Sequence, residues 1–291
     1  MTMPTETIHL DDTVELRSGA LRLALRPDLG GSVAGLWHHH VPVLRSTEPH
    51  ALERPRLGAC FPLVPYSNRL GYRRFRWKGK DFSTQPNFDD SPHSLHGVGW
   101  LRAWTLRSHS PLDAVMALQH SADAHWPFAF EALQYFSLTP HSLRVEMVVT
   151  NTDSVAQPMG LGWHPYFPRR QRSRLHAELS DRWDNDAAHL PTRKVEQAGV
   201  DGDVAHLGFD HCFEGWRGPA RIRDEQFSLQ LSSSLSRLVV YTPNDRDSFC
   251  VEPVSHVSNA IHMADPLAHG IVKLQPGEST EAWMKLDIAV V

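Results

Sequence analysis

The sequence is poor in cysteine and lacks long apolar runs. Its 291 residues include three cysteines, Cys60, Cys212 and Cys250, and no C-x-x-C pair. This argues against a disulfide framework or a structural zinc site, and favours a reducing compartment. No apolar run approaches the roughly 18 residues that span a bilayer. The first residues lack a basic stretch followed by an apolar one, so we expect no secretory signal. We therefore expect a cytoplasmic protein without a membrane partner.

Charge of one sign and several enzyme signatures are also missing. Lys and Arg total 29 against 33 for Asp and Glu, a net charge of −4. A nucleic-acid partner would need a basic excess, so we expect none. The chain contains no G-x-S-x-G, P-loop, G-x-G-x-x-G or H-E-x-x-H motif. Acyl transfer, nucleotide binding and zinc-dependent hydrolysis therefore lack support.

What the sequence does contain is a period-two alternation of apolar and polar residues. It is clear at residues 21–25, 75–77, 143–149, 227–232 and 284–290, and it is typical of half-buried strands. The 21 prolines interrupt long helices. The clearest helix that we predict covers residues 192–198, and it is short. We predict one all-β domain over residues 1–291, an antiparallel sandwich or barrel.

Two segments carry groups suited to proton transfer. Residues 160–168 place His164 in a W-H-P-Y-F run, and an imidazole in an aromatic setting suits a general acid near neutral pH. Residues 249–260 place Glu252 in an apolar strand, where a carboxylate faces solvent, pairs with a cation or is held in a pocket with a raised pKa. From these segments alone, a core histidine and a solvated or ion-paired glutamate are the commoner readings.

Other segments offer hydrogen-bonding groups, and the nine tryptophans offer flat apolar faces of the kind that sugar rings contact. Asn68 and Arg69 follow an apolar, proline-bounded stretch, and His96 precedes a glycine that allows a tight turn. Asp210 lies in an F-D-H-C-F run, where a carboxylate can accept hydrogen bonds from hydroxyls. A structural ion pair for Arg69 and a turn role for Asp210 explain the same residues. His93 and His96 lie in a glycine-rich, non-helical stretch, so we expect no shared metal.

Taken in order, these segments resemble the aldose 1-epimerase (mutarotase) family. The matching pieces are NRLGYRRFRWKGK (68–80), LHGVGWLRAW (95–104), WPFAFEALQYFSL (126–138), GLGWHPYFP (160–168), DHCF (210–213) and VEP (251–253), with Asn259 following. Each piece is weak alone, and the resemblance rests on six in the right order. It implies a large antiparallel β-sandwich with a sugar site on one sheet face and no cofactor. It also implies interconversion of the α and β anomers of a free aldose, such as galactose or glucose. We expect no metal.

The resemblance also implies the site residues: His164 as general acid, Glu252 as general base, Asn68, Arg69, His96 and Asp210 as sugar contacts, and Tyr166 beside the acid. Glu252 would take the proton of the C1 hydroxyl while protonated His164 delivers one to the ring oxygen. We therefore predict a raised pKa for Glu252. We expect Arg69 and His96 to orient the sugar through charge-assisted hydrogen bonds.

Three alternatives stay open. A hexose-6-phosphate mutarotase would hold its phosphate with an arginine cluster, and residues 73–76 or 169–174 could supply one. A non-catalytic carbohydrate-binding protein would keep the sugar contacts. A glycoside-cleaving enzyme would use two carboxylates, for which Asp210 and Glu252 are available. The partner in each case is a small sugar, and a monomer and a dimer are both compatible with the sequence.

Overall fold

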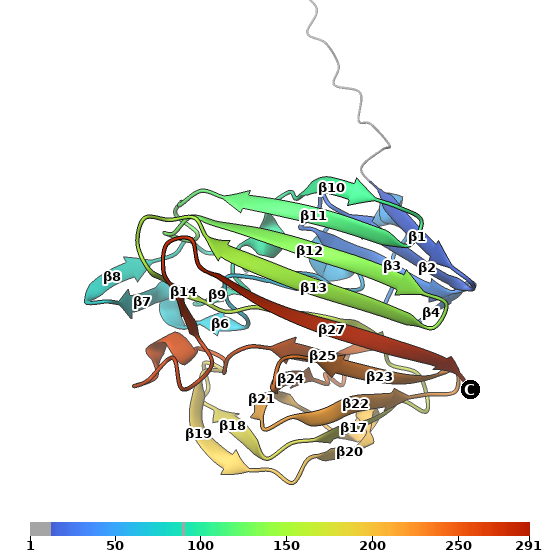
Figure 1. The fold of residues 1–291 in the computed structure, drawn as a ribbon. Coiled ribbons are helices and arrows are strands. Elements are labelled where there is room, and N and C mark those ends of the chain that lie inside the picture. The colour runs from blue at the N-terminus through green and yellow to red at the C-terminus, as the bar shows by residue number, and fades with distance from the viewer. Residues whose placement is uncertain (1–12, 89–90) are drawn as a thin grey trace, which may run out of the picture.

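Two large antiparallel sheets face each other in the structure (Figure 1). The structure is a computed structural model that describes residues 13–88 and 91–291. The first dozen residues, whose order the sequence left open, lie outside the described residues. In Figure 1, β10 to β13 and β27 lie at the top, and β17 to β25, which belong to both sheets, lie below them. The predicted all-β class and antiparallel sandwich are confirmed.

The first sheet has nine strands. Its order is β10 (Thr105–His109), β11 (Asp113–His120), β12 (Phe130–Thr139), β13 (Ser142–Asn151), β27 (Ser279–Val290), β23 (Phe227–Ser233), β22 (Arg217–Arg223), β17 (Arg174–Glu178) and β20 (Val200–Asp203). The longest predicted alternations lie here: β13, β23 and β27 each bury every second residue.

The second sheet has eight strands. Its order is β19 (Pro191–Glu196), β18 (Asp181–Asn185), β21 (Asp210–Glu214), β24 (Arg237–Tyr241), β25 (Ser248–Val254), β15 (Gly162–Trp163) and β5 (Pro62–Leu63), and β16 (Tyr166–Pro168) also pairs with β25. Strand β25 is buried along its whole length.

Smaller sheets complete the fold. A four-stranded sheet contains β1 (Val14–Ser18), β2 (Leu21–Arg26), β3 (Ser32–His38) and β4 (Val41–Pro42). Three pairs are β6 (Arg69–Leu70) with β9 (Ser94–Leu95), β7 (Arg74–Trp77) with β8 (Lys80–Ser83), and β14 (Gln157–Met159) with β26 (Val272–Leu274). The helices found in the described ranges are single 3-10 turns: Pro49–Ala51, Pro55–Leu57, Gly71–Arg73, Gly99–Leu101, Val204–His206 and Ala260–His262.

The main core lies between the sheets and fixes which side of β25 faces the site. Phe249 and Val251 belong to this core together with inward residues of the nine-stranded sheet, such as Val145 and Leu229. Burying each such side chain stabilises the fold by about 1.5–3 kcal/mol. Because side chains alternate along a strand, Cys250 and Glu252 point to the opposite face of the sheet, away from this core.

The predicted helix over residues 192–198 is wrong. This stretch forms most of the edge strand β19, in register with β18, where Trp183 pairs with Lys194. Most of its side chains are exposed, so burial imposes no period-two pattern on the sequence. The β-branched Thr192 and Val195 suit an extended strand.

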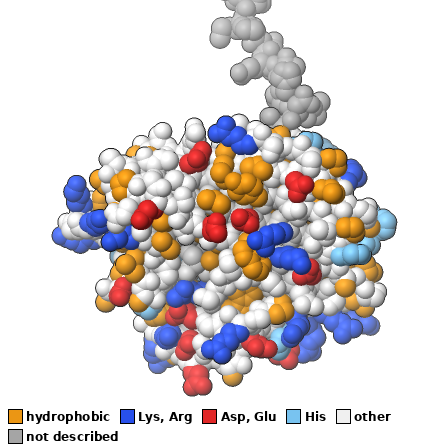
Figure 2. Space-filling view, in the orientation of Figure 1, with side chains coloured by type: hydrophobic (Ala, Val, Ile, Leu, Met, Phe, Trp, Pro, Cys, Tyr) orange, Lys and Arg blue, Asp and Glu red, His pale blue; other side chains and the backbone are white. Residues whose placement is uncertain are grey.

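The distribution of charged side chains on the surface agrees with the small net charge of the sequence. On the face that Figure 2 shows, basic and acidic side chains are interspersed and form no large field of one sign. Across residues 13–88 and 91–291, no helix is long and apolar enough to cross a membrane.

Candidate functional site

Strand register brings the predicted acid and base together. Tyr166 on β16 pairs with Cys250 on β25 in an antiparallel ladder. Gly162 pairs with Val254 further along the same ladder. His164, two residues before Tyr166, therefore lies opposite Glu252, two residues after Cys250. The imidazole Nε2 of His164 is 3.2 Å from Oε1 of Glu252, and both side chains are buried. The four residues form two adjacent rows on one face of the sheet.

The same rows continue onto the next strands. Val239 on β24 pairs with Glu252, and Tyr241 pairs with Cys250. Asp210 on β21 pairs in turn with Tyr241. Because paired residues of an antiparallel ladder point to the same side, the sheet face carries the acid–base pair at one end and the Asp210 carboxylate at the other.

Burial sets the protonation of the pair. It raises the pKa of Glu252 well above its usual value, Asp210 raises it further, and the Arg69 charge opposes the shift. Burial lowers the pKa of His164 well below 6.5, and nearby His96 and Arg45 lower it further. The raised pKa of Glu252 agrees with the prediction. Because burial disfavours charge, the free site favours the neutral forms of both groups, and the imidazolium expected during the reaction stays a prediction for the sugar-bound site.

Aromatic stacking fixes the plane of the His164 ring. The ring stacks on Phe61 at 4.7 Å between centroids and on Tyr166 at 4.5 Å. The guanidinium of Arg45 lies 3.6 Å from the centroid of the Tyr166 ring. Arg45 is held in turn by the backbone carbonyl of Gly58, 2.7 Å from its Nη2. Phe61 and Tyr166 also contact each other, with centroids 6.2 Å apart, and the His96 ring meets His164 in a T-shaped arrangement at 5.1 Å, so the surrounding rings leave the imidazole little freedom to tilt.

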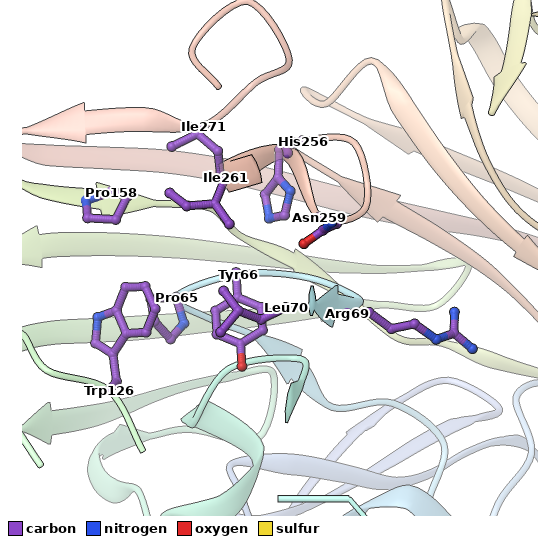
Figure 3. A pocket seen from close by; sticks show the side chains of 11 residues that line it. Pro65, Tyr66, Arg69, Leu70, Trp126, Pro158, His256, Asn259, Ile261 and Ile271 are labelled. Atoms are coloured by element: carbon purple, nitrogen blue, oxygen red, sulfur yellow. The ribbon is translucent and has the colours of Figure 1, made fainter. Parts of the chain in front are cut away.

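A loop of six residues, 67–72, presents Asn68 and Arg69 to the site. In Figure 3, His256 and Asn259 lie on one side of this segment, and the Arg69 side chain extends away from them. Asn68 has a φ of 56°, in the left-handed region that asparagine tolerates better than most residues. Such strained backbone persists only where its surroundings hold it.

Side chains from distant segments accept hydrogen bonds from the backbone N–H groups of this loop. Ser67 N donates to Nε2 of His256 at 3.0 Å, Asn68 N to Nδ1 of His96 at 3.1 Å, Gly71 N to Oδ1 of Asn259 at 2.9 Å, and Tyr72 N to Nδ1 of His93 at 2.9 Å. We call His93, His96, His256 and Asn259 the amide cradle. An imidazole nitrogen that accepts a hydrogen bond carries no proton, so the three rings are neutral.

The pKa values agree with neutral rings. Burial lowers the pKa of His96 to about 3 and that of His256 to about 4. Since Nδ1 of His96 accepts the Asn68 N–H, its Nε2 carries the proton and is a neutral donor. The charge-assisted hydrogen bond expected from His96 is therefore wrong, and of the two residues Arg69 carries the charge.

An ion-paired group surrounds the Asp210 carboxylate. Arg69 Nη2 is 3.3 Å and His189 Nδ1 3.4 Å from Oδ2 of Asp210. Asn185 donates to the backbone carbonyl of Asp210 at 2.8 Å and holds the strand in place. The arginine and the carboxylate orient each other, and both remain partly exposed to the cavity.

All seven predicted site residues line one cavity of about 820 Å³: Asn68, Arg69, His96, His164, Tyr166, Asp210 and Glu252. The arginine clusters considered for a phosphate do not line it, and Arg170 is instead paired with Asp224. Other residues that were not predicted as site residues also line the cavity, among them Phe61, Arg45 and Cys250. Phe61 belongs to a noted proline-rich segment, but nothing in the sequence indicated Arg45, whose partners come from the fold.

Comparison with known proteins agrees with the family resemblance of the sequence. Residues 12–287 match the family model described as aldose 1-epimerase. The chain is 31% identical to YphB, an uncharacterized protein of Escherichia coli K12, over 94% of this chain and 97% of that protein. A crystal structure of a candidate aldose 1-epimerase from the same organism superposes with a TM-score of 0.87 at 30% identity, covering 96% of this chain and 99% of that one.

A more distant neighbour shares the fold. A galactose mutarotase-like protein from Clostridium acetobutylicum superposes with a TM-score of 0.82 at 21% identity, over 95% of each chain. The family match covers nearly the whole sequence and includes every residue of the site built above. The chain therefore belongs to the aldose 1-epimerase family.

Proposed function

We propose that the protein is a cofactor-independent aldose 1-epimerase that interconverts the α and β anomers of a free aldose such as galactose or glucose. The observation that carries the proposal is the contact of His164 Nε2 with Glu252 Oε1 at 3.2 Å, in a cavity large enough for a sugar. Family membership supports it independently.

The reaction needs one proton acceptor and one donor at a single carbon. Glu252 takes the proton of the C1 hydroxyl while His164 gives one to the ring oxygen, and the C1–O5 bond breaks to leave the open aldehyde. Rotation about C1–C2 and closure with the two roles reversed give the other anomer. Both oxygens are bonded to C1, so two groups in contact can serve both.

The proton that the pair shares explains how these roles arise. Proton transfer from Glu252 to His164 gives carboxylate and imidazolium without any exchange with solvent. A hydrogen bond from the C1 hydroxyl to the carboxylate, and one from the imidazolium to the ring oxygen, stabilise this charged form. Arg69 contributes as well, because its charge favours the carboxylate form of Glu252.

We assign the sugar contacts from the positions of polar side chains that line the cavity. Arg69, Asn68 and Asp210 supply donors and acceptors from the loop and from β21, and the Nε2–H of His96 adds a neutral donor. Trp100, which also lines the cavity, offers an aromatic surface. We further propose that the protein works in the cytoplasm, where its three unpaired thiols persist.

The decisive experiment follows optical rotation of fresh α-D-galactose and α-D-glucose. We expect acceleration by the protein, and a loss of about 10²–10⁴-fold in kcat for Glu252→Gln. Glu214→Gln is the matched control, because Glu214 is a partly buried carboxylate of the same sheet that is paired with Arg237 instead of facing the cavity. Near wild-type turnover by Glu252→Gln contradicts the assignment. Sugar binding without acceleration indicates a non-catalytic carbohydrate-binding protein.

A sugar that carries an anionic group is a second candidate, favoured by one observation. Arg246 lines the same cavity from an exposed loop position, and neither of the clusters considered in the sequence includes it. The polarimetric series therefore includes glucose 6-phosphate. Activity on the phosphate that falls in Arg246→Ala, while activity on free glucose is low in both proteins, assigns the phosphorylated substrate.

A further inference from the structure

A thiol beside the acid–base pair, that of Cys250, has no part in the proposed mechanism. Cys250 precedes Glu252 by two residues on β25, so the two side chains share a face of the sheet. One ligand atom each from Cys250, Glu252 and His164 can be chosen so that all three lie within 4.8 Å of one another. All three residues are buried and line the cavity.

These three residues offer a sulfur, a nitrogen and an oxygen, the ligand types that zinc takes in proteins. Zinc bonds of about 2.0–2.3 Å place tetrahedral ligands about 3.3–3.6 Å apart. The 3.2 Å contact of His164 with Glu252 is already close to this spacing. The thiol has to approach by about 1 Å, and the cavity leaves the fourth position open to water.

A second observation points to the same place. Oε2 of Glu252 is a buried carboxylate oxygen that accepts no hydrogen bond within residues 13–88 and 91–291, although its residue is only 2% exposed. A buried acceptor without a partner is costly, and a cation in the cavity would satisfy it. On binding, the Cys250 thiol proton and the proton of the His164–Glu252 pair pass to solvent, and the resulting thiolate and carboxylate balance the charge of a divalent ion.

We propose that His164, Cys250 and Glu252 bind a borderline-soft divalent cation, with Zn²⁺ as the type ion, and that the bound ion blocks epimerisation. The metal occupies the lone pairs with which His164 and Glu252 exchange protons with the sugar. The block rests on the proposed function, whereas the metal binding does not. No metal motif marks this site in the sequence, because His164 is far from the other two ligands along the chain and joins them only through the pairing of β16 with β25.

The test measures metal binding directly. Full-length protein, freed of metal with a chelator, is titrated with ZnCl2 and separately with MgCl2 by calorimetry. We expect one zinc ion per chain, no heat from magnesium, and a zinc affinity at least about tenfold lower in Cys250→Ser, since even changes outside the ligand shell cost 10–100-fold. Titration with Co²⁺ supplies a thiolate-to-metal charge-transfer band that Cys250→Ser should lose.

Cys212→Ser is the matched control. Cys212 is a buried thiol on β21 that pairs with Val239 on β24, and Val239 pairs with Glu252 on β25. Cys212 therefore lies on the same face of the sheet as Glu252, but two strands away from it. We expect this variant to bind zinc like the wild type. Zinc binding that is equal in Cys250→Ser and the wild type places the ion on other histidines and overturns the proposal.

Activity gives a separate readout. With a sugar that the protein epimerises, zinc should inhibit competitively, a chelator should restore the rate, and Cys250→Ser should need at least tenfold more zinc for the same fractional inhibition. If no sugar is epimerised, calorimetry and the cobalt band still decide whether the ion binds. Strong zinc binding through Cys250 without inhibition overturns the inhibitory role.

Discussion

At the scale of single residues, the proposed acid–base pair depends on an imidazole ring that neighbouring aromatic rings hold in place. Phe61 and Tyr166 both contact the His164 ring and each other, His96 meets it in a T-shaped arrangement, and Arg45 lies against Tyr166. Orientation matters here, because a misplacement of about 1 Å between reacting groups can cost 10²-fold in rate. We therefore expect these rings to position the imidazole.

Replacing Phe61 tests this positioning. Phe61→Leu removes one of the aromatic rings that contact His164 and should lower kcat by about 10–10²-fold with little change in KM. Polarimetric progress curves at several sugar concentrations separate the two constants. Phe167→Leu is the control, since Phe167 packs on Phe249 in the core and should lose stability without a comparable loss in kcat. Equal kinetics for Phe61→Leu and the wild type contradict the positioning role.

The sequence predicted the site residues through a family motif and not through their contacts. His164 and Glu252 were identified because short runs around them resemble known segments. Arg45 and Cys250 were not, because their roles arise from the partners that the fold supplies. The protonation of His164 also required the structure, since a sequence does not show how completely water is excluded from a side chain.

At the scale of elements, the loop 67–72 is held by the amide cradle and makes little regular structure of its own. Asn68 and His96 both adopt a positive φ, and so does Asn259. Gly160 allows the His256 ring to approach closely, because a Cβ there would lie 2.1 Å from Cδ2 of the imidazole. The position of Arg69 therefore depends on histidines that are far away in the chain.

The cradle predicts a pH dependence of stability. His256 has a pKa of about 4 in the folded state, against about 6.5 when unfolded, so the unfolded chain binds more protons between these values. Its contribution is complete above pH 6.5 and is lost as the pH falls toward 4. Between pH 7 and pH 5 the loss is about 2 kcal/mol.

Denaturant unfolding at both pH values checks this prediction. His256→Gln keeps a side-chain acceptor but has no group that titrates in this range. We expect the wild type to lose about 2 kcal/mol more than the variant between pH 7 and pH 5. Equal losses in the two proteins contradict a neutral, buried His256.

The sequence predicted strands correctly where one face of the strand is buried, and the prediction failed where neither face is buried. The alternation at residues 143–149 predicted β13, whose pattern of burial follows the sequence residue by residue. The failure at β19 has the opposite cause, because an exposed edge strand has no face that must be apolar. Short strands such as β15 carry too few residues for any period to be read.

At the scale of the whole molecule, one buried side chain joins three sheets. Gln134 on β12 donates from Nε2 to the carbonyl of Gly31, which leads into β3, at 3.1 Å. Its Oε1 accepts the indole N–H of Trp163 on β15 at 3.3 Å. Trp163 directly precedes His164, so this link ties the eight-stranded sheet, which carries the candidate site, to the nine-stranded sheet.

Removing the amide should loosen the sandwich. Gln134→Leu leaves the Trp163 indole and the Gly31 carbonyl without a partner, and should lower the free energy of unfolding by about 1–3 kcal/mol. Chemical denaturation measures the change. Gln119→Leu, an exposed change on the neighbouring strand, should stay within about 0.5 kcal/mol of the wild type. An unchanged midpoint for Gln134→Leu contradicts the link.

The central place of β25 has a consequence for synthesis. Its neighbours β24, β15 and β16 precede it in the chain, so the eight-stranded sheet remains open at its middle until the last part of the sequence has left the ribosome. Until then, strand edges and apolar faces that β25 later covers remain exposed, the condition under which nascent chains aggregate. A chain cut short just before residue 248 would thus carry His164 and every proposed sugar contact but lack Glu252, the proposed base.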